Sequence, residues 1–133
     1  MTREPSELDK VADAWVDKMA ELSPSFATYI GRKGSDHLLD DPSPEAIEEH
    51  LAESKKFHAQ VKAAPVADRV DEVTKAAMLA DFELAEELHD SGVWKRDLDV
   101  LASPAQGIRD IFDLSPTDSV EAWENLTLSL IHI

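Results

Sequence analysis

The chain has 133 residues, a length typical of one globular domain. Its 28 acidic and 13 basic side chains give a formal net charge of -15, which repels phosphate backbones and anionic lipid head groups. The absence of cysteine excludes disulfides, thiolate nucleophiles and thiolate zinc sites. We therefore expect a protein stabilised by packing, with neither nucleic acid nor a membrane as partner.

The N-terminal residues 1–10 are charged and contain no apolar central region of the kind that marks a leader peptide. No stretch of the chain approaches the roughly 20 apolar residues that a membrane-spanning helix requires. These two features predict a cytoplasmic protein.

Apolar residues recur at helical spacing from the N-terminus onwards. Ser6 and Asp9 form a candidate capping pair, followed by a stripe of apolar residues: Leu8, Val11, Trp15, Met19 and Leu22. This pattern predicts a first helix over 6–22. Ser23 with Pro24 then starts one or two helical turns that end at Gly31, and a loop is expected over 31–42.

Two long helices are predicted in the middle of the chain. The first begins at Ser43-Pro44 and ends before Pro65, with one face made of Ile47, Leu51, Ser54, Phe57 or His58, and Val61. The second opens near Asp68 or Asp71 and ends at Gly92, with a broad apolar face made of Val73, Ala77, Ala80, Leu84 and Leu88, widened by Met78, Phe82 and Ala85. A face this broad is expected to contact more than one neighbour.

The C-terminal third has a connector over 94–102, a short helix over 103–114 and a last helix that is apolar and uncapped where the chain ends. The apolar positions of this last helix are Val120, Trp123, Leu126 or Thr127, and Leu130. We therefore predict an all-α fold, an open array of about five helices that forms a single helical region over 1–133. We also expect that the reading frame is truncated within the last helix.

The histidines do not form a recognisable zinc motif. A helical zinc hydrolase pairs two histidines one turn apart with a glutamate beside the first, but no glutamate follows any of His37, His50, His58, His89 and His132. His50 and His58 lie eight residues apart, about 12 Å along a helix, which is too far for one ion. Glu86 and His89 have the spacing of di-metal bundles, but a second copy is missing. His89 is better explained as a residue near a helix C-terminus, where its cation favours the dipole.

Other catalytic patterns fail as well. No Gly-x-Ser-x-Gly elbow occurs, and the Ser-Pro pairs at Ser23, Ser43, Ser103 and Ser115 are explained by helix starts. Gly31 and Gly34 do not belong to a phosphate-binding loop. Asp36, Asp40 and Asp41 lack the spacing of a calcium loop, so a solvated acidic loop is the better interpretation. We predict no catalytic, cofactor-binding or metal-binding residue in this chain.

The tryptophans are interpreted as packing residues. Trp15 and Trp123 lie on the apolar stripes of their predicted helices, while Trp94 stands at the start of the connector. Large aromatic side chains in such positions most often serve as core or interface anchors. We therefore predict core packing for Trp15 and Trp123.

Several segments together resemble the bacterial domain of unknown function 885 family. They are residues 15–31, 38–46, 103–108, 115–116 and 121–124 in this order and spacing. The resemblance implies the N-terminal part of a longer helical protein, similar to zincin-like zinc metallopeptidases with an HExxH helix far downstream. It implies zinc for the full-length protein, a peptide substrate, and downstream helices as the partner of this segment. Residues 128–133 depart from the family pattern.

The leading hypothesis is therefore an inactive N-terminal segment of a metallopeptidase-like hydrolase. The alternative is a small acidic all-helical interaction module without catalytic activity, acting through the helices at 68–92 and 119–133. An autonomous enzyme is not favoured, because no nucleophile, metal set or phosphate loop is found in the sequence.

Overall fold

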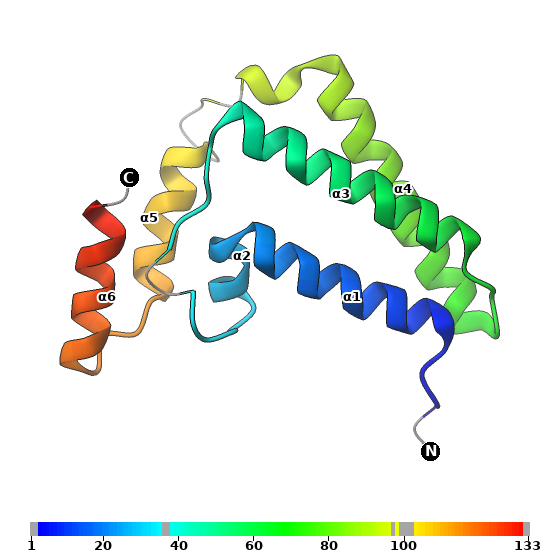
Figure 1. Ribbon diagram of the computed structural model, residues 1–133, viewed down its shortest axis with the longest axis horizontal. Helices are drawn as coiled ribbons and strands as arrows, with labels where there is room; N and C mark the ends of the chain where they lie inside the picture. The colour runs from blue at the N-terminus through cyan, green and yellow to red at the C-terminus, as the bar shows by residue number, and fades with distance from the viewer. Residues whose placement is uncertain (1–2, 36–37, 97, 99–102, 132–133) are drawn as a thin grey trace. The chain divides into compact units, whose positions relative to one another are not determined.

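The computed structural model describes residues 3–35, 38–96, 98 and 103–131. These residues form six α-helices: α1 (Glu7–Leu22), α2 (Pro24–Tyr29), α3 (Pro44–Ala63), α4 (Arg69–Ser91), α5 (Pro104–Leu114) and α6 (Val120–Ile131). A short 3-10 helix, Val93–Arg96, follows α4 in the predicted connector. No strand occurs among the described residues, and the all-α prediction is confirmed (Figure 1). The short segment α2 raises the number of helices from the expected five to six.

The helices begin where the capping chemistry places them. Ser6 and Asp9 cap α1 reciprocally, because the Ser6 N–H donates to Asp9 Oδ2 at 2.8 Å and the Asp9 N–H donates to Ser6 Oγ at 3.1 Å. Ser43 Oγ accepts from the Ala46 N–H at the start of α3. Gly92 ends α4 with φ of 72°, a left-handed conformation that glycine adopts without steric cost.

The chain divides into two compact units, which are described separately. The first unit contains residues 1–17 and 43–95, and the second contains residues 18–42 and 96–133. That the two units belong to a single helical region over 1–133 stays a prediction.

In the first unit α3 and α4 are neighbours (Figure 1), and the unit has a core that contains aromatic side chains. Its buried apolar residues are Leu8, Phe57, Val61, Ala64 and Phe82, with Val11, Trp15, Met78 and Leu79 packed against them. The Trp15 ring lies 5.1 Å from the Phe57 ring and 5.2 Å from the Phe82 ring, centroid to centroid. These contacts confirm that Trp15 is a core residue.

A buried carboxylate ties the N-terminus to the turn between α3 and α4. Asp71 is fully buried and accepts hydrogen bonds from Arg3 Nη1, Ser6 Oγ and the Ala67 N–H at 2.9 Å each. The Ala67 bond lowers the pKa of the Asp71 carboxyl below its ordinary value, assisted by Ser6 and Arg3, although burial alone would raise the pKa. The buried charge is thus compensated.

Helix α4 carries apolar side chains on two opposite faces. Met78 and Phe82 face the core of the unit, whereas the second stripe remains exposed at 55% for Val70, 56% for Val73, 53% for Leu84 and 45% for Leu88. Ala77 and Ala80, which continue this stripe, are exposed too. The predicted broad face is therefore divided in two: Met78 and Phe82, expected only to widen the face, pack on the core, whereas the stripe itself from Val73 to Leu88 stays exposed.

The second unit buries mostly small or polar side chains. Its described buried residues are Ala20, Ala27, Ser103, Ser115 and Leu126. Trp123 is 57% exposed and its indole N–H donates to the Thr117 carbonyl at 3.1 Å, so the prediction of core packing for Trp123 is wrong.

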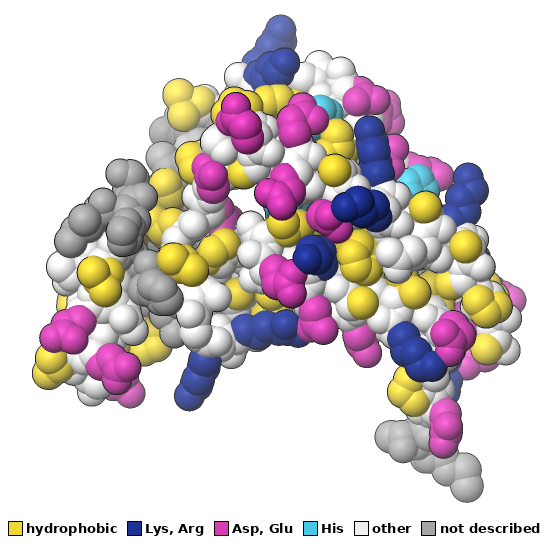
Figure 2. Space-filling view, viewed as in Figure 1, with side chains coloured by type: hydrophobic (Ala, Val, Ile, Leu, Met, Phe, Trp, Pro, Cys, Tyr) yellow, Lys and Arg dark blue, Asp and Glu magenta, His cyan; other side chains and the backbone are white. Residues whose placement is uncertain are grey.

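Acidic side chains are interspersed with hydrophobic ones over the visible face of the molecule, rather than gathered in one place (Figure 2). Within the described residues, no helix is both long enough and apolar enough to cross a lipid bilayer.

Candidate functional site

The candidate site lies in the second unit, where α2 meets the extended segment 38–42. Asp40 contacts the start of α2, since its carboxylate accepts from Ser23 Oγ at 3.0 Å, from the Ser25 N–H at 3.0 Å and from Ser25 Oγ. Ser23 Oγ in turn accepts from the Phe26 N–H at 3.1 Å. These bonds hold the segment 38–42, which has no helix or strand and lies in the predicted loop, beside α2.

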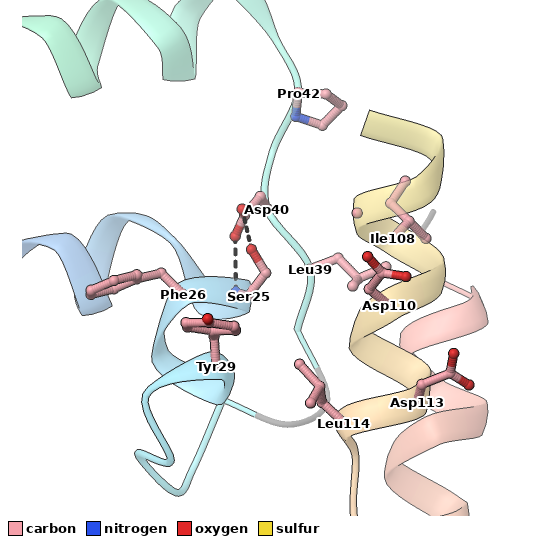
Figure 3. A pocket seen from close by; sticks show the side chains of 11 residues that line it. Ser25, Phe26, Tyr29, Leu39, Asp40, Pro42, Ile108, Asp110, Asp113 and Leu114 are labelled. Carbon is pink, nitrogen blue, oxygen red and sulfur yellow. Dashed lines mark hydrogen bonds between the residues drawn. The ribbon is translucent and has the colours of Figure 1, made fainter. Parts of the chain in front are cut away.

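A groove opens between this pair and α5, which contacts α2. Its volume is about 690 Å³, within the range of small-molecule and peptide side-chain sites. The apolar part of the lining is Phe26, Tyr29, Leu39, Pro42, Ile108 and Leu114. In the view of Figure 3, Leu39 and Leu114 lie between the ring of Tyr29 and helix α5. The groove is therefore apolar and bounded by a 74% exposed tyrosine ring.

The charged side chains in the lining are all carboxylates: Asp40, Asp110 and Asp113. Asp40 is occupied by the hydrogen bonds to Ser23 and Ser25. Asp110 and Asp113 stand one turn apart on α5, are exposed, and have no hydrogen bond or ion pair to another described residue. The groove thus combines an apolar floor with uncompensated negative charge.

His58 of α3 and His89 of α4 each lie beside a different glutamate in the first unit. His58 Nδ1 lies 2.8 Å from Glu86 Oε1, and His89 Nε2 lies 3.3 Å from Glu48 Oε1. No group of three or more histidine, aspartate or glutamate side chains in the described ranges is arranged to hold a metal ion. His50 belongs to no such group, and His37, His132 and Asp36 lie outside the described residues. Glu86 and His89 consequently contact different partners.

The other candidate residues are explained by packing, helix capping or turn conformation. His89 stacks on Trp94, with ring centroids 5.7 Å apart, near the C-terminal end of α4. Ser23 and Ser43 accept cap hydrogen bonds, whereas Ser103 starts α5 without one and bonds to Gln106 instead. Ser115 follows the end of α5 and α6 begins only at Val120, so the explanation of Ser115 as a helix start is wrong. Gly31 has φ of 76°, a turn conformation that explains this glycine without a ligand.

A family model for bacterial proteins of unknown function (DUF885) matches residues 24–132. The chain belongs to this family. No curated protein matches the chain. The match includes residues 43–95 of the first unit, most of the second unit and every residue that lines the groove.

Three of the five segments that carry the resemblance to DUF885 proteins meet in the groove. Residues 15–31 contribute Tyr29, residues 38–46 contribute Leu39 and Asp40, and residues 103–108 contribute Ile108. Sequence reasoning did not identify this convergence, and it did not select Asp110 or Asp113. The sequence signal that could have found them is the i, i+3 spacing of Asp110 and Asp113, which places both carboxylates on the side of a short helix that also carries an apolar residue.

Proposed function

We propose that residues 1–133 are the non-catalytic N-terminal helical segment of a zinc-metallopeptidase-like hydrolase, whose HExxH helix lies outside these residues. Zinc, when bound to that helix, would supply an activated water for peptide hydrolysis. The residues of this chain would bind neighbouring helices and line the substrate path. A cytoplasmic location belongs to the same proposal.

One observation carries the proposal: the second apolar face of α4. Val70, Val73, Leu84 and Leu88 expose about half of their surface each on one side of a 23-residue helix. A contiguous apolar stripe of this kind marks an interaction surface or an aggregation liability in a soluble protein. Membership of DUF885 supports helices of the same parent protein as the partner.

The first test is to read the DNA downstream of codon 133 in the native gene. The proposal requires an in-frame histidine-glutamate-x-x-histidine helix, and its absence would contradict the proposal. In the second test, the downstream polypeptide is expressed as a separate chain together with residues 1–133. We expect the two chains to co-purify and to hydrolyse a peptide in a zinc-dependent manner.

A pair of variants locates the contact. Leu84→Glu places a charge in the exposed stripe of α4 and is expected to abolish co-purification. Ala59→Glu introduces the same side chain at an exposed position of α3 and should leave the complex intact. Equal effects of the two variants would contradict docking through α4. Stoichiometric tight zinc binding to residues 1–133 alone, measured by calorimetry, would contradict the non-catalytic assignment.

The alternative, an acidic interaction module, is favoured by the exposed side chains of α6. Val120 is 76% exposed and Trp123 is 57% exposed, so this helix offers an aromatic anchor. A monomeric chain that melts cooperatively, binds no hydrophobic dye and loses a specific protein complex on Trp123→Ala would favour this alternative over the first proposal.

A further inference from the structure

The groove beside α5 has the features of a binding site with a defined ligand polarity. Its volume of about 690 Å³ suits a ligand of drug or dipeptide size. Leu39, Ile108 and Leu114 provide apolar surface, and burial of such surface favours an apolar ligand group. The ring of Tyr29 adds an exposed aromatic face on the α2 side (Figure 3).

The charge of the lining determines which charge a ligand of this groove can carry besides its apolar group. No lysine or arginine is among the groove residues, whereas Asp110 and Asp113 carry negative charge without a partner in the described part of the chain. An anionic ligand would therefore be repelled by the groove and by the net charge of -15. A cation would gain an ion pair with Asp110.

We propose that this groove binds a peptide segment in which an aromatic or aliphatic side chain is followed by a lysine or arginine. The apolar side chain occupies the surface made by Leu39 and Ile108, and the basic group reaches Asp110, with Asp113 one turn farther along α5. A basic peptide fits better than a free amine, because the lining offers apolar side chains for an apolar group as well as carboxylates for a cation. This inference rests on the proposed function, in which the parent protein acts on peptides.

Three short peptides test the charge selection: acetyl-Phe-Arg-amide, acetyl-Phe-Gln-amide and acetyl-Phe-Glu-amide. Each is titrated into the isotope-labelled chain of residues 1–133, and binding is followed by amide chemical shifts in nuclear magnetic resonance. The Gly107 amide, which borders the groove, is the reporter. We expect the arginine peptide to bind roughly fivefold more tightly than the glutamine peptide, with the glutamate peptide weakest, and we expect added salt to reduce these differences.

Two pairs of variants assign the selectivity to α5. Asp110→Asn and Asp113→Asn remove the unpaired charges at exposed positions, so folding should be unaffected, and both should bring the arginine peptide close to the affinity of the glutamine peptide. Asp118→Asn and Glu121→Gln change the same types of charge outside the groove and should not alter the selectivity. Circular dichroism checks that all four variants remain helical.

The inference is overturned by equal affinities for the three peptides, by shifts confined to residues outside the groove, or by unchanged selectivity in Asp110→Asn with Asp113→Asn. Its failure is distinguishable from failure of the proposed function, because binding to residues 1–133 requires no hydrolysis. A parent protein without zinc-dependent peptidase activity, together with selective peptide binding here, would overturn the proposed function alone. Zinc-dependent activity without charge selection in the groove would overturn this inference alone.

Discussion

The two compact units bury very different side chains. The first unit encloses Leu8, Phe57, Val61 and Phe82, and its buried charge at Asp71 is hydrogen-bonded on several sides. In the second unit, Leu126 is the one large apolar side chain that is buried among the described residues. The apolar residues of α2 and α5 line an open groove instead.

This difference separates stability from binding. A packed core gains free energy from apolar burial and leaves no room for a ligand. A unit whose apolar side chains remain accessible has less internal stability but can gain that burial when a ligand or partner arrives. The first unit therefore joins a packed core to the exposed stripe of α4, whereas the second unit is the one whose inward apolar side chains are expected to bind a ligand in the groove.

The largest expected contrast comes from truncating one apolar residue in each unit. Phe82→Ala should destabilise the first unit by about 3–5 kcal/mol, because it removes a buried ring that contacts Trp15. Ile108→Ala should cost less than about 1 kcal/mol, since this groove residue is only partly buried. Both losses of stability are measured by urea unfolding with hydrogen exchange as the readout, in which the amides of α3 report on the first unit and those of α5 report on the second. Equal losses would break the contrast.

The stability of the first unit is also expected to depend on pH through Asp71. The pKa of Asp71 is lowered in the folded protein, so its stabilising contribution is complete above the unfolded value of about 3.9 and is lost as the pH falls through the folded pKa. Asp71→Asn should lower the urea midpoint of the first unit at pH 7, and this difference from the unmutated protein should shrink below about pH 4. A difference that is constant from pH 7 to pH 3 would contradict the buried charge network.

Helix capping is expected to have a smaller effect. Ser43→Ala removes the hydrogen bond from the Ala46 N–H and should cost about 1 kcal/mol. Ser103→Ala at the start of α5 should cost less, because no side-chain cap bond is present there. Thermal melts of the two variants give the comparison, and a larger loss for Ser103→Ala would show that α5 depends more on its start than the geometry indicates.

The smallest effect is expected at α6. Trp123→Ala should change the unfolding free energy by no more than about 0.5 kcal/mol, because the side chain is mostly exposed. Trp15→Ala provides the control and should destabilise the first unit strongly, since its ring contacts Phe57 and Phe82. Similar losses for the two tryptophans would mean that Trp123 is buried after all.

Most helix limits followed from local chemistry and were predictable from the residues alone, Ser115 being an exception because it ends α5 and starts no helix. Ser6 with Asp9, Ser43 with Pro44, and Gly92 determine helix ends through bonds within a few residues, so no tertiary contact is needed to place them. The apolar periods of α1 and α3 likewise identified Leu8, Trp15 and Val61 as core positions. The absence of strand-like alternation gave the all-α class.

Only the tertiary structure decided which apolar surfaces are covered. Periodicity shows that α4 is apolar over a broad arc, but it does not say that Phe82 packs inside while Leu84 stays exposed, because that choice depends on α1 and α3. Trp123 was wrongly assigned to the core, because its place on the apolar stripe of α6 does not show whether that stripe is covered. The groove arises from Asp40 bonding to α2 and from α5 contacting α2, which are pairings between distant residues. Local sequence patterns carry no information about such pairings, since they depend on how the chain returns to itself.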